Sequence, residues 1–477
     1  MNGESISAKR FINMMAKFSI SSWVNFIIGI TTVAITTRLF TPDVYGALNM
    51  FNTTTAIFVS VSCLGLDGAF IRFYYEPPKG WDTRQLFAKC LIFACITLLV
   101  ISLIVCVGFY EEITSQLFHT VSFYIAVLLS VNSLSLLVLN NFFSQYYRIG
   151  NDPYHYTIQQ ILVQFFSKLF VVSAAFISPT IDVVLTMNTV GIFSLMLVYF
   201  FIQKKTVLPE KIIWSYRGFW PVLKFALFYW PQSTVLTLNA FIIPFIITSQ
   251  LDSYSLGIYA SAGFFVSAFG VIQGGFRTYW SAFMYEHYKD EQEKIIKIHS
   301  YVVIFIILLL SGFILVQHIV YLLIGSEYHA SRLFFSLVLV DPLLSLLEQT
   351  TEYGTNLAKK NHQNLIIFFL SVTINIVGTY LLLPLLGLIG AAIAAAGAAT
   401  IRFILATWRG QKYYVSIEKY WKTLSGMFLI ILLAISNCVF VNAYELECLA
   451  ILLIIGTAML IYHSYIKEMI VYIHRAK

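Results

Sequence analysis

NIVGTYLLLPLLGLIGAAIAAA, residues 375–396, is an apolar stretch without a charged side chain. It joins two runs, 365–385 and 388–408, that are each long enough to cross a bilayer, because a membrane-spanning helix uses about 20 apolar residues. Runs of this kind recur along the whole chain. We predict the other twelve spans near 17–38, 45–70, 86–109, 118–145, 157–178, 183–203, 219–248, 254–280, 300–324, 331–352, 425–443 and 446–466.

The composition agrees with an all-α integral membrane protein of about fourteen transmembrane helices. Of the 477 residues, 59% are hydrophobic and 11% charged, and the mean hydropathy is +0.79. A soluble domain needs about a quarter of its residues charged. We therefore exclude soluble globular, disordered and nucleic-acid-binding classes, and no stretch is left for a separate catalytic domain.

The basic residues predict the orientation of the spans. With the N-terminus inside, most Lys and Arg residues fall in cytoplasmic segments, and the outer loops carry only Arg38 and Arg332. Cationic loops stay on the cytoplasmic side. We expect both termini in the cytoplasm, the N-terminal segment as a retained tail, and the net charge of +7 as mainly an orientation signal.

Two weak matches at one offset predict a duplication. The segment around Gly46 aligns with the segment around Gly257, and Arg148 aligns with Lys359. Because each half has an even number of spans, the repeat is expected to be parallel. The predicted domains are an N-terminal six-helix lobe (1–205), a cytoplasmic linker (206–218), a C-terminal six-helix lobe (219–410), and two appended helices with a cytoplasmic tail (411–477).

Charged residues inside the predicted spans are the strongest functional candidates, because an unpaired charge in hydrocarbon costs several kcal/mol. Span 331–352 places Asp341, Ser345, Glu348 and Glu352 on one helix face. Positive charge is available elsewhere in the bilayer from two residues, Lys168 and Arg402. Two interpretations stay open: the acids and bases pair between helices, or they line a hydrated cavity. In the second, Asp341, Glu348 and Asp67 are candidates for ion coupling.

Other spans carry small or polar side chains at helical spacing. Span 17–38 includes Asn25, span 45–70 ends near Asp67, span 219–248 contains Gln232, and span 254–280 ends in Arg277. Tight helix packing and cavity lining are alternative explanations of such stripes.

Metal and cofactor chemistry has no signature in the chain. The six cysteines lie singly in apolar runs, without a CxxC pair or a nearby His at ligand spacing. There is also no Walker loop, HExxH or nucleophile elbow. We expect no metal, no cofactor and no catalytic residue.

Three segments resemble polysaccharide transporters, the O-antigen and capsule flippases of the MOP superfamily. They are RLFTPDVYG (38–46), its echo LDSYSLGIYASA (251–262), and the stretch at 375–396. The resemblance implies two six-helix lobes in a MATE-like V around a cationic cavity that opens alternately to either side. It further implies a flippase that moves undecaprenyl-pyrophosphate-linked oligosaccharides across the bacterial cytoplasmic (inner) membrane, for O-antigen, lipopolysaccharide or capsule biosynthesis.

Under this hypothesis, cationic side chains hold the pyrophosphate and polar ones satisfy the sugar hydroxyls. The predicted substrate-binding residues are Arg277, Arg72, Lys168, Arg38, Gln232 and Asn25. The expected partners are the lipid-linked oligosaccharide, membrane lipid, and a polysaccharide polymerase with glycosyltransferases, and the protein is expected to be a monomer.

Two alternatives remain. One is a MATE-like multidrug or small-solute antiporter coupled to cations, for which the acidic face of span 331–352 would bind the ion. The other is a membrane polysaccharide polymerase or glycosyltransferase, which is disfavoured because the longest connections are short and cytoplasmic. We therefore predict a transporter and not an enzyme.

Overall fold

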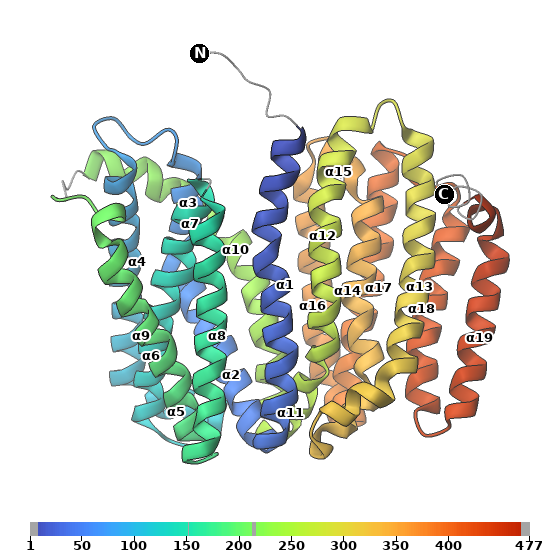
Figure 1. The fold of residues 1–477 in the computed structure, drawn as a ribbon, viewed down its shortest axis with the longest axis horizontal. Coiled ribbons are helices and arrows are strands. Elements are labelled where there is room, and N and C mark those ends of the chain that lie inside the picture. Colours follow the sequence, from blue (N-terminus) through green and yellow to red (C-terminus); the bar gives the residue numbers. More distant parts are fainter. Residues whose placement is uncertain (1–7, 151, 212–215, 469–477) are drawn as a thin grey trace. The chain divides into compact units, whose positions relative to one another are not determined.

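The computed structural model describes residues 8–150, 152–211 and 216–468, and these residues form helices without a strand (Figure 1). The chain divides into two compact units, residues 1–257 and 258–477. The predicted tails and linker fall partly on residues 1–7, 212–215 and 469–477, which lie outside the described residues.

Unit 1 contains the first predicted lobe together with the long helix that follows it. Its helices are α1 (Ala8–Leu39), α2 (Pro42–Cys63), α3 (Leu66–Phe73), α4 (Thr83–Ile104), the π-helix η1 (Val105–Phe109), α5 (Tyr110–Phe118), α6 (Phe123–Leu136), the π-helix η2 (Leu137–Phe143), α7 (Ser144–Ile149), α8 (Pro153–Ile177), α9 (Ile181–Val207), α10 (Tyr216–Gln250) and the start of α11 (Ser253–Ser261).

Unit 2 contains the remaining helices. These are α12 (Gly263–His287), α13 (Gln292–Leu323), the 3-10 helix η3 (Ser326–Leu333), α14 (Phe335–Thr351), α15 (Tyr353–Leu357), α16 (Asn361–Leu386), α17 (Leu388–Tyr413), α18 (Tyr420–Phe440) and α19 (Tyr444–Ile461). Unit 1 extends past the predicted lobe end at residue 205 because α10 packs against α2 and α3. The four predicted domain ranges therefore stay a prediction.

The predicted fold class, an all-α integral membrane protein, is confirmed. Within the described residues, 11 helices are long and apolar enough to cross a membrane, and 13 if each of two bent pairs counts as one span. The shorter apolar segment Val24–Leu39 of α1 occupies the place of the first predicted span. Every predicted span thus corresponds to a helix or a bent helix pair.

The second span is broken, and the break positions polar groups inside unit 1. Leu64 (φ 47°) and Gly65 (φ 75°) are both left-handed, so α2 stops at Cys63 and α3 continues at an angle of 54°. A Cβ on Gly65 would lie 2.4 Å from the carbonyl oxygen of Ala226 in α10. Only glycine satisfies both the positive φ and this close approach.

The two glycines aligned by the internal repeat lie against the same junction of unit 1. A Cβ on Gly46 of α2 would lie 1.9 Å from the carbonyl oxygen of Ser253, and one on Gly257 of α11 would lie 2.0 Å from that of Pro42. Real Cβ atoms essentially never come closer than 3.0 Å to another heavy atom. The repeated motif therefore supplies glycine on both sides of one backbone-to-backbone contact.

A buried lysine lies in the apolar core of unit 1. Lys89 of α4 is 0% exposed, and its Nζ lies 3.1 Å from the centroid of the Trp81 ring without a hydrogen-bond partner. Trp81 in turn stacks on Phe219 at the start of α10. Among the described residues, the ammonium group of Lys89 thus makes a cation–π contact with Trp81.

Buried polar contacts attach the last two helices to the rest of unit 2. Gln317 of α13 donates to Asn437 Oδ1 of α18 (2.7 Å) and to Glu447 Oε1 of α19 (2.8 Å). The side chain of Glu447 is 1% exposed, because α19 begins at Tyr444 and carries this carboxylate against α13.

The opposite end of the appended helices carries a second carboxylate. Glu418, in the connection before α18, accepts hydrogen bonds from Lys422 and Tyr465. These two donors lower the pKa of the Glu418 carboxyl from its ordinary value.

Candidate functional site

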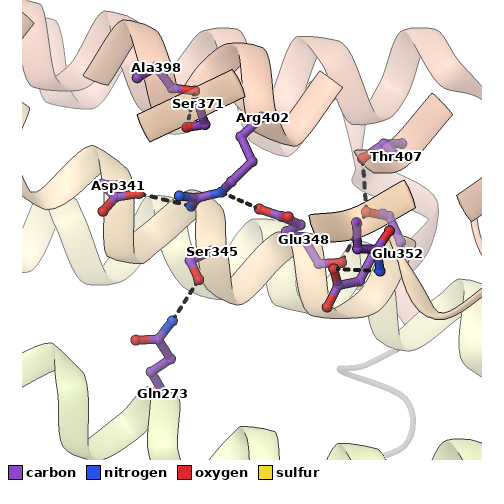
Figure 2. A network of polar contacts seen from close by, with 11 residues as sticks. Gln273, Asp341, Ser345, Glu348, Glu352, Ser371, Ala398, Arg402 and Thr407 are labelled. Atoms are coloured by element: carbon purple, nitrogen blue, oxygen red, sulfur yellow. Dashed lines mark hydrogen bonds and ion pairs between the residues drawn. The ribbon is translucent and has the colours of Figure 1, made fainter. Parts of the chain in front are cut away.

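A cluster of charged side chains lies in unit 2, where α17 packs against α14 (Figure 2). Arg402 of α17 reaches between two acids of α14. Its Nη2 lies 2.8 Å from Asp341 Oδ1, and its Nε lies 2.9 Å from Glu348 Oε2. One guanidinium therefore bridges two carboxylates that lie two helical turns apart.

Helix geometry explains this arrangement. Positions seven residues apart lie on one face of an α-helix, so Asp341 and Glu348 present their carboxylates to the same neighbour. The planar guanidinium offers donors in a fixed fork, which suits two separate acceptors. The two acids differ in exposure: the side chain of Asp341 is 47% exposed and that of Glu348 is 12% exposed.

Neutral polar groups continue the cluster on either side. Gln273 of α12 donates to Ser345 Oγ of α14 at 3.0 Å, as Figure 2 shows. Asn364 of α16 donates to Glu352 Oε2 at 3.4 Å. The polar face predicted for span 331–352 is thus present, and each of its four members contacts a neighbouring helix.

Arg277 lies on α12, beside this cluster. Its side chain is exposed, and no carboxylate lies within ion-pair distance of it in the described ranges. It is close enough to Glu352 to act on that carboxylate electrostatically. Among the residues predicted to bind a head group, Arg277 therefore keeps its guanidinium donors available.

The other cationic candidates lie in unit 1, on different helices. Arg72 ends α3 and pairs with Glu76 at 3.1 Å, with both side chains largely exposed. Lys168 is half-buried on α8, and no carboxylate of the described residues pairs with it. Arg38 is exposed in the last turn of α1.

The remaining candidates of unit 1 are polar or acidic. Asn25 is half-buried on α1, and its Oδ1 is buried without a hydrogen-bond partner. Asp67 lies in the first turn of α3, where it accepts from Asn141 of η2 at 3.1 Å. Gln232 belongs to α10, but its side chain lies outside the described part of the structure. The candidates are thus spread over both units, and the structure joins two of them, Asp341 and Glu348, through Arg402.

Sequence reasoning missed two features that shape unit 1. The first is the break at Leu64 and Gly65, for which the lone glycine before Asp67 was the available signal. The second is the π-helix η2, which carries Asn140 and Asn141. Within it, the carbonyl oxygen of Leu139 accepts a hydrogen bond from Gln159 Nε2 of α8 at 3.1 Å. π-Helical segments occur frequently at functional sites.

The described residues contain no group of three or more His, Cys, Asp or Glu side chains that could hold a metal ion. All six cysteines are free thiols, as expected for isolated apolar positions.

No protein-family model and no curated protein sequence matches the chain. Among solved structures, it is similar to a lipid II flippase MurJ in an inward closed conformation, with 16% identity and a TM-score of 0.70, over 94% of this chain and 99% of that one. An inward-facing multidrug resistance MATE family transporter of the MOP superfamily has 13% identity and a TM-score of 0.55, over 81% of this chain and 94% of that one.

A third similar structure is the MATE multidrug transporter DinF-BH, solved as a complex. It has 15% identity and a TM-score of 0.55, over 88% of this chain and 99% of its own. These likenesses show that the chain has the fold of this flippase and these transporters. The proteins that it resembles are a flippase and multidrug transporters.

Proposed function

We propose that this protein is a flippase that moves undecaprenyl-pyrophosphate-linked oligosaccharides across the bacterial cytoplasmic membrane, for O-antigen, capsule or other surface polysaccharide. The observation that carries the proposal is the likeness to the lipid II flippase over nearly the full length of both chains. The two MATE transporters match less closely, and each covers a smaller share of this chain.

The state of the acids in unit 2 also favours a flippase over a cation-coupled antiporter. An antiporter of the kind considered above would need Asp341 and Glu348 to be available to the ion, whereas both are ion-paired with Arg402. Arg277 has no such partner among the described residues. A cation with available donors suits a pyrophosphate, and the polar Gln273 and Ser345 suit sugar hydroxyls.

In this proposal the protein works by alternating access. A pyrophosphate and its sugars cannot cross hydrocarbon unaided, because desolvating charged and hydroxyl groups is too costly. Arg277, Arg72, Lys168 and Arg38 would replace the water around the pyrophosphate, with Gln232 and Asn25 contributing to the sugars. The substrate's isoprenoid chain would remain in the bilayer. A polysaccharide polymerase and glycosyltransferases stay expected partners.

The test is headgroup translocation in proteoliposomes that contain the full chain. A lipid-linked oligosaccharide is incorporated, and the fraction accessible to a membrane-impermeant sugar-modifying reagent is followed over time. We expect Arg277→Ala to slow translocation about tenfold, which corresponds to losing one charge-assisted hydrogen bond of about 1.5 kcal/mol. Arg84→Ala, which removes an exposed arginine at the start of α4, is the matched control and should leave the rate unchanged.

One result would contradict the proposed function, and another would contradict only the role given to Arg277. If the wild-type vesicles translocate no lipid-linked oligosaccharide but exchange organic cations for protons or sodium, the protein is an antiporter. If translocation occurs and Arg277→Ala matches wild type, the flippase stands and Arg277 is removed from its binding site.

A further inference from the structure

A titratable cluster lies where α13, η3 and α19 meet, at the end of unit 2 that the distribution of basic residues predicts to be outside. Its members are His318 near the end of α13, Arg332 in η3 and Glu447 in the first turn of α19. Arg332 and Glu447 each lie against one ring nitrogen of His318. None of the three belongs to the substrate-binding residues proposed above.

The contacts of His318 fix the position of its ring proton. Arg332 Nη2 lies 3.0 Å from His318 Nδ1. A guanidinium group has only donors, so Nδ1 is the acceptor and the proton of the neutral ring lies on Nε2. Nε2 faces Glu447 Oε2, 3.6 Å away. The neutral ring therefore offers an acceptor to the cation and an N–H to the carboxylate.

A second proton on His318 would disrupt the contact with Arg332. It would bind Nδ1, whose lone pair accepts the hydrogen bond from the guanidinium. Two N–H groups and two positive charges would then face each other across 3.0 Å, where like charges repel strongly. Glu447 attracts an imidazolium ion, but it lies at the other nitrogen and does not remove this repulsion. Arg332 must therefore turn away when His318 is charged.

Protons from the solvent can reach this histidine. The side chain of His318 is 36% exposed, whereas that of Glu447 is 1% exposed. The ring of Tyr444 meets the imidazole edge to face, with centroids 5.3 Å apart. Among the described residues, the charged or titratable groups that face His318 are thus Arg332, Glu447 and Tyr444. An imidazole changes its charge between about pH 5 and pH 8, so it is the group suited to respond there.

Arg332 connects η3 to the turn between α18 and α19. Its Nη2 also lies 3.5 Å from the carbonyl oxygen of Val441, directly after the end of α18 at Phe440. The Nε atom of Arg332 is buried without a hydrogen-bond partner. Both of these hydrogen bonds of the guanidinium are thus made by Nη2, and a movement that breaks the bond to His318 also withdraws the donor from the turn.

Other polar contacts at this end do not depend on the charge of His318. Asn437 Nδ2 of α18 donates to the carbonyl oxygen of Arg332 at 3.1 Å, and Gln317 Nε2 of α13 donates to Asn437 Oδ1 at 2.7 Å. Amide groups do not titrate in this pH range. These contacts keep α13, η3 and α18 together, so the effect of protonation is confined to the turn and the start of α19.

We propose that His318, Arg332 and Glu447 form a pH-sensitive switch for the appended helices. When His318 is neutral, it accepts the hydrogen bond from Arg332 and the turn between α18 and α19 is held against η3. When His318 is protonated, Arg332 is released and the turn loosens. The proton concentration on the outer side thereby sets how firmly the start of α19 is held. The inference does not depend on the identity of the transported substrate.

The test is hydrogen–deuterium exchange of the purified full-length protein in detergent at about pH 5 and about pH 8. Labelling times are scaled for the pH dependence of the chemical exchange rate. We expect the corrected exchange of amides 441–447 to rise about three- to tenfold at the lower pH, as for the loss of one hydrogen bond. Amides 427–434, in the middle of α18, should exchange alike at both pH values and report that the bundle is intact.

Three variants assign the response to His318. His318→Gln can accept from Arg332 but cannot take up a proton, so amides 441–447 should exchange alike at both pH values. Arg332→Gln removes the repelled cation, so acidification should no longer raise their exchange. His463→Gln changes an exposed histidine beyond the opposite end of α19, is the matched control, and should respond as the wild type.

Two results would overturn the proposal. One is a wild-type protein whose amides 441–447 exchange alike at both pH values. The other is a His318→Gln variant, with protected amides 427–434, that keeps the wild-type response, which would assign the proton to Glu447. Neither result bears on translocation of the lipid-linked oligosaccharide.

Discussion

Replacing Arg402 by methionine tests whether the charged cluster of unit 2 is held together by its arginine. Arg402 is 13% exposed and makes two short ion pairs. Its removal leaves the carboxylate of Glu348, which is 12% exposed, without its cation. Breaking a buried pair from one side costs about 3–5 kcal/mol. The bond to Asp341 adds little, because that side chain is 47% exposed and screened by solvent.

We expect Arg402→Met to lower the free energy of unfolding by about 3–4 kcal/mol, and we expect most of this loss to be recovered in the double variant Glu348→Gln/Arg402→Met. Recovery is expected because the double variant no longer contains an unpaired buried charge. The assay is thermal unfolding of purified variants in one detergent, analysed as a double-mutant cycle. Lys412→Met, at the exposed end of the same helix, is the control and should unfold with the wild type.

Two outcomes would refute this account. If Arg402→Met is as stable as the wild type, the ion pairs contribute nothing and the acids are available to a coupling ion. If the second substitution adds to the damage of the first, Glu348 has a role that does not depend on Arg402. Translocation by a stable double variant would show that the cluster is structural.

Three further predictions concern other parts of the molecule. Gly46→Ala should destabilise the protein by about 3 kcal/mol or more, since the new Cβ would lie 1.9 Å from a backbone oxygen, whereas Gly29→Ala, with nothing within 4 Å, should be neutral or stabilising in the same melting assay. Trp81→Ala should lower the free energy of unfolding by about 3–5 kcal/mol, and adding Lys89→Met should recover part of this loss because it removes the ammonium group left in the core. Equal melting temperatures of the single and double variants would contradict this prediction. Hydrogen bonds lower the pKa of Glu418 in the folded protein, so the ionised carboxylate stabilises the fold at a pH above the carboxyl pKa of the unfolded chain. This stabilisation is lost as the pH falls through the carboxyl pKa of the folded protein. The wild type should therefore lose more stability than Glu418→Gln on acidification below about pH 5.

Hydropathy predicted the spans well because the signal is local. Each predicted span corresponds to a helix or a bent helix pair of the described residues. A backbone in hydrocarbon must satisfy its hydrogen bonds internally, so an apolar run of sufficient length has few alternatives to a helix. The polar face of span 331–352 was predictable for the same reason, because helical periodicity places Asp341, Ser345 and Glu348 together.

The sequence could not predict which charges pair. Arg402 lies 61 residues from Asp341 and 54 from Glu348, and periodicity within one helix says nothing about which helix it faces. Both interpretations of these acids were therefore open until the packing of α17 on α14 was known. The same limit applies to the cluster around His318, whose members come from three elements.

By itself, then, the sequence determined a helical membrane protein, its spans, and the repeated glycine motif, because these depend on short-range properties of the chain. Tertiary structure alone decided that Gly46 and Gly257 lie at one junction, that Arg402 neutralises two acids, and that His318 lies between Arg332 and Glu447. The physical reason is that ion pairs and close backbone contacts join residues far apart in the chain, and their partners are set by helix packing, which local hydropathy does not encode.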